Sequence, residues 1–202
     1  MKQLLSAVSI AALSLAFAPA ASAAVAAGQS AADFTLTDVS GKSHKLSDFR
    51  GKYVVLEWFN SECPFVVKHY GTGNMQDLQS RYTAQGVVWL VINSTNPGHG
   101  DYKSPDQSKA ILADWKAGPT ALMLDPDGKV GQLYGAKTTP HMWVIDPKGT
   151  VIYAGGIDDK RSTNPADVKT AKNFVAAALD EAKAGKPVTV ASAPPYGCSV
   201  KY

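Results

Sequence analysis

The sequence predicts an α/β fold of three layers, in which a mixed central β-sheet carries helices on both faces. A β-rich run over 53–59 and an uninterrupted apolar run over 87–92 are separated by a stretch with helical spacing, which predicts two parallel strands joined by a crossover. Two further apolar runs flank the turn sequence DPKG, which predicts an antiparallel hairpin over 142–154. Apolar residues at helical spacing over 165–184 predict a long final helix. A parallel pair combined with a hairpin requires a mixed sheet.

Shorter elements are expected between these segments. Alternating polarity predicts strands, and proline after a capping residue predicts the first turn of a helix. These signals give short strands at 34–37 and 44–46, helices beginning at Pro64 and Pro105, a strand at 121–124 and a short helix at 130–134.

The composition is that of an ordinary globular protein. The chain has 202 residues, of which 45% are hydrophobic and 18% are charged, so the apolar side chains suffice for a substantial core. The formal net charge is +3, and no long basic run concentrates it. Binding to nucleic acid is therefore not indicated.

The first 23 residues are typical of a secretory signal peptide. Lys2 precedes an apolar stretch over 4–18, and small residues at 21–23 form a cleavage site. A membrane-spanning helix needs about 20 apolar residues. This stretch is shorter, so we expect no stable membrane insertion. Cleavage would release a periplasmic or secreted protein into a compartment that permits disulfides.

The rest of the chain is expected to form one domain. Residues 24–32 are small and unpatterned, which predicts a disordered lead-in. Residues 33–185 contain all the predicted elements. Residues 186–202 form a proline-rich tail that carries Cys198.

Cys63 is the candidate centre of chemistry. It follows a predicted buried strand and directly precedes the helix that begins at Pro64. In open α/β sheets, chemistry gathers at the carboxyl ends of strands. A thiol at a helix N-terminus lies at the positive end of the helix dipole, which stabilises its thiolate. We therefore expect a lowered pKa and a reactive thiolate; the alternative is an inert buried cysteine.

Cys198 is the second of two cysteines, and the sequence leaves three roles open for it. As a resolving thiol it would attack an oxidised form of Cys63 or a mixed disulfide on it. As a structural partner it would close a long loop through a permanent disulfide. In the third case the two cysteines never meet.

Four segments together resemble the AhpC/TSA redoxins, a peroxiredoxin-like group of the thioredoxin superfamily. They read LSDFRGKYVVLEWFNSECPF, GVVWLVINST, TTPHMWVIDPKGTVIYAGGIDD and YGCSVKY, and they extend over nearly the whole mature chain. The last segment resembles exported bacterial redoxins that end in a Gly-Cys-Ser motif. The resemblance implies a thioredoxin-like fold and thiol chemistry at Cys63.

The resemblance also assigns neighbours to Cys63. Pro140 matches the cis-proline that faces the active cysteine, and Thr139 would contribute a backbone contact to an extended substrate. Dithiol relatives carry Cys-x-x-Cys; in this chain Asn60 takes the place of the first cysteine and Cys63 is the second, which predicts that dithiol exchange within one motif is not possible. Asn60 would then contribute a side-chain hydrogen bond at the substrate site.

These features predict an exported thiol oxidoreductase that acts on a peroxide or on a protein thiol or disulfide. Cys63 would be the reactive thiolate and Cys198 a candidate resolving thiol, with no cofactor and no metal. The alternatives are a redox-inactive binding module and a copper-binding protein that uses Cys63 with His141. We expect His141 to begin a strand at the surface and the charge run at 158–161 to be a solvated loop.

Overall fold

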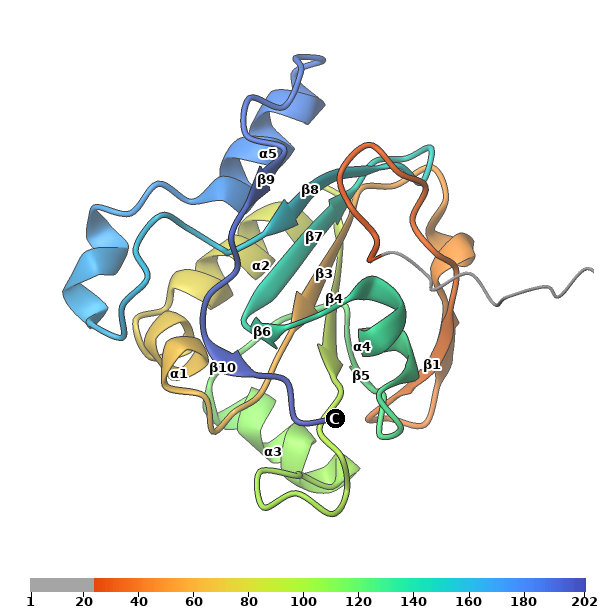
Figure 1. The fold of residues 1–202 in the computed structure, drawn as a ribbon, viewed down its shortest axis with the longest axis vertical. Helices are drawn as coiled ribbons and strands as arrows, with labels where there is room; N and C mark the ends of the chain where they lie inside the picture. The colour runs from red at the N-terminus through yellow and green to blue at the C-terminus, as the bar shows by residue number, and fades with distance from the viewer. Residues whose placement is uncertain (1–23) are drawn as a thin grey trace, which may run out of the picture.

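The chain folds around an eight-stranded mixed sheet with the strand order β2-β1-β5-β4-β3-β7-β8-β9 (Figure 1). The structure is a computed structural model that describes residues 24–202. The predicted signal peptide, 1–23, lies outside these residues. The strands are β1 (Thr35–Asp38), β2 (Ser43–Lys45), β3 (Val54–Trp58), β4 (Val88–Asn93), β5 (Ala121–Leu124), β6 (Thr138–Thr139), β7 (His141–Ile145), β8 (Val151–Gly155), β9 (Ser192–Ala193) and β10 (Cys198–Ser199).

Helices and 3-10 turns separate many of the strands along the chain. They are α1 (Pro64–Gly71), α2 (Asn74–Thr83), α3 (Pro105–Asp114), α4 (Lys129–Tyr134) and α5 (Phe174–Lys183), with 3-10 turns η1 (Leu46–Phe49) and η2 (Pro165–Lys169). β3 pairs in parallel with β4 across α1 and α2, and β4 pairs in parallel with β5 across α3. β7 and β8 form the predicted hairpin, and β7 pairs antiparallel with β3. The predicted mixed sheet is confirmed.

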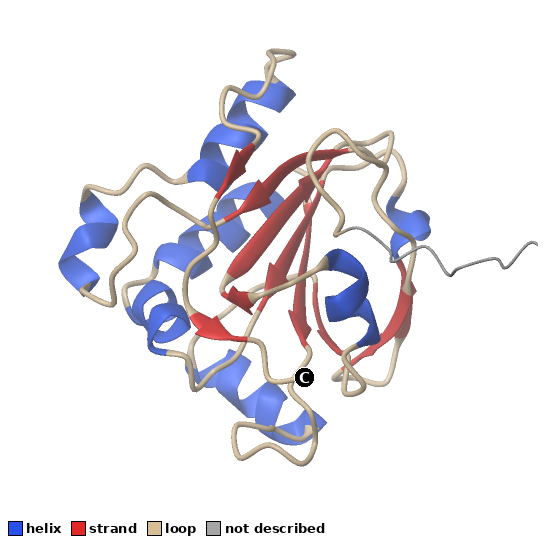
Figure 2. Ribbon diagram, in the orientation of Figure 1, coloured by secondary structure: helices blue, strands red, loops and turns tan. Residues whose placement is uncertain are grey.

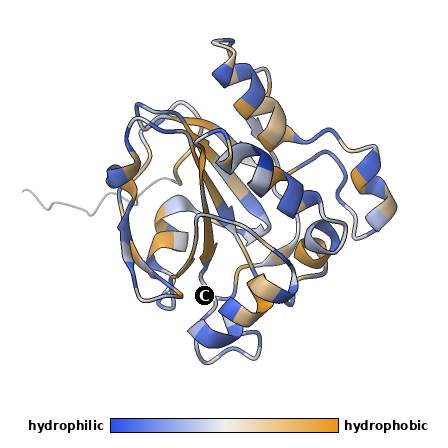
Figure 3. Ribbon diagram, turned by 180° about the vertical axis from the view of Figure 1, so that it is seen from behind, coloured by the Kyte–Doolittle hydropathy of each residue, from blue (hydrophilic) through white to orange (hydrophobic). Residues whose placement is uncertain are grey.

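Helices lie over both faces of the sheet (Figure 2), which separates two hydrophobic cores, one on each face. On β3, Val55 belongs to the core beneath α1, α2 and α5, whereas Leu56 and Trp58 belong to the core beneath α4. Because both faces are covered, all five residues of β3 are buried. The strands are correspondingly hydrophobic when the molecule is seen from behind (Figure 3). This sandwich fixes the carboxyl end of β3, from which the chain continues to Cys63.

Two predictions about the ends of the domain are wrong. Residues 24–32 are not a disordered lead-in, because Val25 and Ala31 are buried and Gly28 N–H donates to Val151 O at 2.8 Å. The final helix does not extend over 165–184. It is divided into η2 and α5, because the Asn173 side chain accepts a hydrogen bond from Ala176 N–H and so caps a new helix.

A carboxyl group, that of Glu57, lies inside the core. Glu57 is fully buried on β3 and accepts hydrogen bonds from Tyr70 Oη and Trp89 Nε1, both at 2.8 Å. Burial raises the pKa of Glu57 to about 7, and the hydrogen bonds from Trp89 and Tyr70 only partly oppose it. The folded state therefore favours the protonated acid near neutral pH.

This placement makes the stability contribution of Glu57 depend on pH. A carboxyl whose pKa rises from 4.5 to about 7 on folding contributes fully below pH 4.5 and loses about 3 kcal/mol as the pH rises through 7. We expect Glu57→Gln to cost about 1 kcal/mol at pH 4, where the amide replaces a neutral acid, and to be stabilising at pH 8. Denaturant unfolding of both proteins across this range measures the difference. A difference that does not change with pH would contradict the assignment.

Candidate active site

Cys63 lies at the N-cap of α1, and Pro64 occupies the first helical position as the sequence predicts. The turn from β3 is fixed by two backbone hydrogen bonds. Phe59 N–H donates to Ile92 O at 2.9 Å, and Cys63 N–H donates to Asn60 O at 3.1 Å. The side chain of Cys63 is only 1% exposed. The fold therefore holds this thiol at a helix N-terminus, below the surface.

The loop before β7 covers the thiol from the other side. The Thr139–Pro140 peptide bond is cis. Trp58 at the end of β3 pairs with His141 at the start of β7, and this register brings the loop over the start of α1. The Sγ atom of Cys63 lies 2.9 Å from Thr139 O. Thr139 and Pro140 thus lie where the sequence resemblance implied.

Cys198 reaches the same place from the C-terminal tail. Strand β10 pairs antiparallel with β6, with Cys198 opposite Thr139 and Ser199 opposite Thr138 (Figure 1). Cys198 packs against the core cluster that contains Cys63, and Thr139 O lies 2.9 Å from Cys63 Sγ. Both cysteines are free thiols in this structure. The hypothesis that the two never meet is therefore wrong.

The two thiols differ in acidity. Burial opposes ionisation of Cys63, but the side-chain hydroxyl of Thr139 and the thiol of Cys198 lie near the sulfur, favour the thiolate and hold the pKa of Cys63 below its ordinary value. Burial raises the pKa of Cys198 to about 11, and its hydrogen bond to Cys63 adds to this rise. The pair thus contains one thiol suited to be a thiolate and one suited to stay protonated.

The side chain of Asn60 does not lie where the resemblance to dithiol relatives implied. Asn60 does not face Cys63, because its side chain accepts a hydrogen bond from Glu62 N–H at 2.8 Å and donates to Asp101 Oδ2 at 3.0 Å. Val66 lies in the first turn of α1, three residues after the N-cap Cys63. The N-cap position of Cys63 favours it as the first position of a dithiol motif, with buried Val66 at the second.

His141 and one residue of the charge run are buried rather than exposed, whereas Asp159 and Arg161 are exposed as the sequence predicts. His141 does begin β7, but it is buried, with its ring 4.0 Å from that of Trp143. Asp158 does not lie in a solvated loop; it is 4% exposed and accepts a hydrogen bond from Tyr196 Oη. Sequence reasoning missed Tyr196, whose proximity to the Gly-Cys pair was the only local signal.

Neither a metal centre nor a membrane span is found in the part of the chain that the structure describes. Among residues 24–202, no three His, Cys, Asp or Glu side chains gather to hold an ion. Within the same residues, no helix has the length and apolar character needed to cross a bilayer.

Comparison with known proteins identifies the family. Residues 27–154 match the model of the AhpC/TSA family. The chain belongs to this family. A curated relative, the thiol-disulfide oxidoreductase ResA of Geobacillus kaustophilus (strain HTA426), is 32% identical over 123 residues, which cover 54% of this chain and 70% of the relative. The family match ends before the tail, so Cys198 lies outside it.

Solved structures confirm the thioredoxin-like fold. An uncharacterized conserved protein from Geobacillus kaustophilus superposes with a TM-score of 0.77 at 28% identity, covering 87% of this chain and 92% of that protein. A provisionally assigned thiol:disulfide interchange protein, DsbE, from Chlorobium tepidum gives a TM-score of 0.55 at 28% identity, covering 73% and 93%.

The corrected motif can be tested by restoring a second thiol. In a Cys198→Ser background, we expect Val66→Cys to form a disulfide with Cys63 under mild oxidation, because residues three apart in the first helical turn satisfy disulfide geometry. Asn60→Cys should form far less, because that side chain points toward Asp101. Mass spectrometry of the oxidised variants measures both, and the reverse order would show that the motif begins at Asn60.

Proposed function

We propose that this protein is an exported thiol–disulfide oxidoreductase in which Cys63 is the nucleophile and Cys198 the resolving thiol. The observation that carries the proposal is the pairing of Cys198 with Thr139, which puts the second thiol within reach of Cys63 Sγ. The relatives named as thiol-disulfide oxidoreductases support the same class of reaction. The expected signal peptide supports export.

The reaction consists of two exchange steps. The Cys63 thiolate attacks one sulfur of a substrate disulfide, forms a mixed disulfide and releases the other substrate sulfur as a thiolate. Cys198 then loses its proton and attacks Cys63 Sγ. The Cys63–Cys198 bond forms, the mixed disulfide breaks, and the second substrate sulfur leaves and takes up a proton. The substrate disulfide gains two electrons from the protein dithiol, which an external dithiol must regenerate.

The acidity of the two thiols suits this order. Cys63 accepts several hydrogen bonds that favour its thiolate, so it attacks first. The pKa of Cys198 is about 11, partly because of the charge and hydrogen bond of Cys63. Once Cys63 is in a mixed disulfide, that contribution is gone and Cys198 ionises more readily. The electrostatic coupling therefore delays the second thiol until the first has reacted.

Peroxide reduction is the second candidate, and membership of the AhpC/TSA family favours it. Here the Cys63 thiolate would attack the peroxide, forming a sulfenic acid and releasing an alcohol or water. Cys198 would then condense with the sulfenic acid, giving the same disulfide and water. Both routes use the same two thiols, so they differ only in the oxidant.

Single-thiol variants test the proposed roles. With oxidised glutathione as the probe, Cys198→Ser should retain a glutathione adduct on Cys63, because nothing resolves it. The wild type should instead accumulate the Cys63–Cys198 disulfide, and Cys63→Ser should do neither at a comparable rate. Mass spectrometry after an acid quench distinguishes the three. Equal reactivity of Cys198 in Cys63→Ser would contradict the assigned order.

The pH dependence of alkylation tests the reactivity of Cys63 separately. In Cys198→Ser, we expect the rate of reaction with iodoacetamide to rise with pH and level off at a midpoint below about 8.5, the ordinary cysteine value. A midpoint at or above that value, with no oxidation by glutathione disulfide or hydrogen peroxide, would favour a redox-inactive binding module. Hydrogen peroxide in the same variant, with a sulfenic acid trap, decides between the two oxidants.

A further inference from the structure

The C-terminal tail is held on both sides of Cys198. Before it, β9 pairs with the edge strand β8. After it, Val200 N–H donates to Lys137 O at 3.1 Å, and Asn96 N–H donates to Lys201 O at 2.7 Å. Tyr202 Oη donates to Ala136 O at 2.8 Å. Cys198 is thus presented by a fastened segment.

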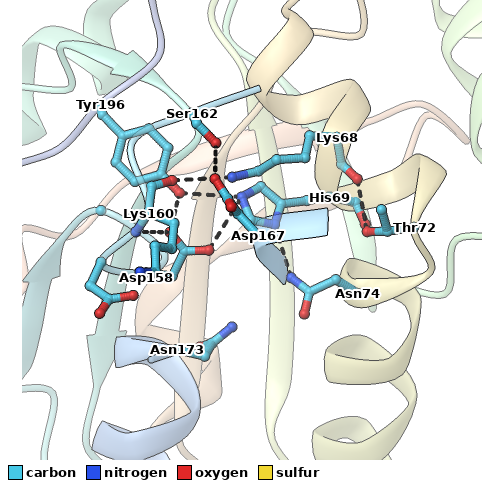
Figure 4. Close-up of polar contacts among 12 residues, drawn as sticks. Lys68, His69, Thr72, Asn74, Asp158, Lys160, Ser162, Asp167, Asn173 and Tyr196 are labelled. Carbon is cyan, nitrogen blue, oxygen red and sulfur yellow. Dashed lines mark hydrogen bonds and ion pairs between the residues drawn. The ribbon is translucent and has the colours of Figure 1, made fainter. Parts of the chain in front are cut away.

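Tyr196, two residues before Cys198, attaches the tail through several buried contacts. Its ring is 7% exposed and packs edge-on against Phe65 of α1, with the centroids 5.8 Å apart. The Nζ atom of Lys68 lies 5.5 Å from the centre of the same ring. Its hydroxyl donates to Asp158 Oδ1 (Figure 4). Tyr196 therefore joins the tail both to α1 and to the loop after β8.

His69 completes the environment of the Tyr196 hydroxyl. Its Nδ1 atom lies 2.9 Å from Asn74 Nδ2, an amide donor, which leaves the proton on Nε2. His69 Nε2 is 3.4 Å from Tyr196 Oη and 3.9 Å from Asp158 Oδ2 (Figure 4). All three side chains are buried, so the hydroxyl cannot replace these partners with water.

Gly197 lets the tail approach the loop that covers Cys63. Its φ is +136°, and a Cβ atom at this position would lie 2.0 Å from Thr139 O. A side chain is therefore excluded by both backbone conformation and space. The same carbonyl oxygen is 2.9 Å from Cys63 Sγ. The close approach at Gly197 thus determines how near Cys198 comes to its target.

We propose that Tyr196 is a positioning residue that sets the effective concentration of the Cys198 thiol at Cys63. The inference rests on the proposed function and concerns its second step. In that step Cys198 attacks Cys63 Sγ of the mixed disulfide, one S–S bond replaces another, and the substrate thiol leaves with the proton. A tail on a flexible linker would offer its thiol at only about millimolar effective concentration. Tyr196 holds the tail so that this concentration is higher.

A two-phase thiol assay measures this step directly. Reaction of the reduced mature protein with 5,5′-dithiobis(2-nitrobenzoate) releases one coloured thiolate when Cys63 forms the mixed disulfide and a second when Cys198 resolves it. We expect Tyr196→Phe, which loses the hydrogen bond to a buried carboxyl, to slow the second release about tenfold. The first release should not be slower. The equilibrium constant for forming the Cys63–Cys198 disulfide from oxidised glutathione should fall by a similar factor.

Tyr82→Phe is the matched control. Tyr82 is also buried and donates to an aspartate, Asp180 Oδ1, at 2.9 Å, but it contacts α5 rather than the tail. Because the Asp180 carboxylate is 48% exposed, Tyr82→Phe should lose somewhat less stability than Tyr196→Phe and should not change the second release. If both variants slowed it equally, the effect would be structural and the inference would fail. Gly197→Ala should slow the second release as well, because it displaces the tail without removing a core side chain.

Two results separate the inference from the proposed function. A second release in Tyr196→Phe as fast as in the wild type, and absent in Cys198→Ser, would overturn the positioning role and leave the function standing. A wild type without a second release would overturn the function itself. If Tyr196→Phe does not fold, Asp158→Asn weakens the same hydrogen bond by removing the charge of its acceptor, and a smaller slowing of the second release is expected.

Discussion

The antiparallel pairing of Cys198 with Thr139 is the contact on which the site depends. It extends the loop around the cis peptide Thr139–Pro140 by one strand, taken from the far end of the chain. Without it, Cys63 would be a single thiol at a helix cap. With it, Cys63 has a second thiol within reach, a closed surface and a set of hydrogen-bond donors that favour its thiolate. The helix N-terminus and the Thr139–Pro140 loop hold Cys63, and this backbone contact adds the second thiol beside it.

That contact needs rigid elements on both sides. The central sheet supplies them, because β3 ends beside the start of β7 and so fixes both Cys63 and Thr139. The tail is fixed separately, by Tyr196 against α1 and by Tyr202 against the segment after α4. Entropy lost in ordering the tail is offset by these buried contacts rather than by a covalent bond. The tail can therefore be released and replaced, which a permanent disulfide would not allow.

The sequence was informative where signals are local. Proline after Cys63 predicts a helix start, and apolar runs predict the strands of the sheet, so the fold and the position of Cys63 are confirmed. Non-local contacts escaped prediction. Residues 24–32 and the tail have no periodicity, because each pairs with a distant backbone edge rather than with its own neighbours. The role of Gly197 becomes evident only once Thr139 O is known to face it. The direction of the Asn60 side chain was likewise not predictable, because it depends on Asp101, 41 residues further along the chain.

The pairing also has a consequence for the order of events under the proposed function. The backbone edge of β6 at Thr139 is occupied by β10. An extended substrate segment that pairs with the same edge must displace the tail, and with it Cys198. Cys63 is 1% exposed while the tail is in place, so displacement would also uncover the nucleophile. When the tail pairs again, it brings Cys198 back to the mixed disulfide and takes the edge from the substrate segment. The resolving step and the release of the substrate would then be the same movement.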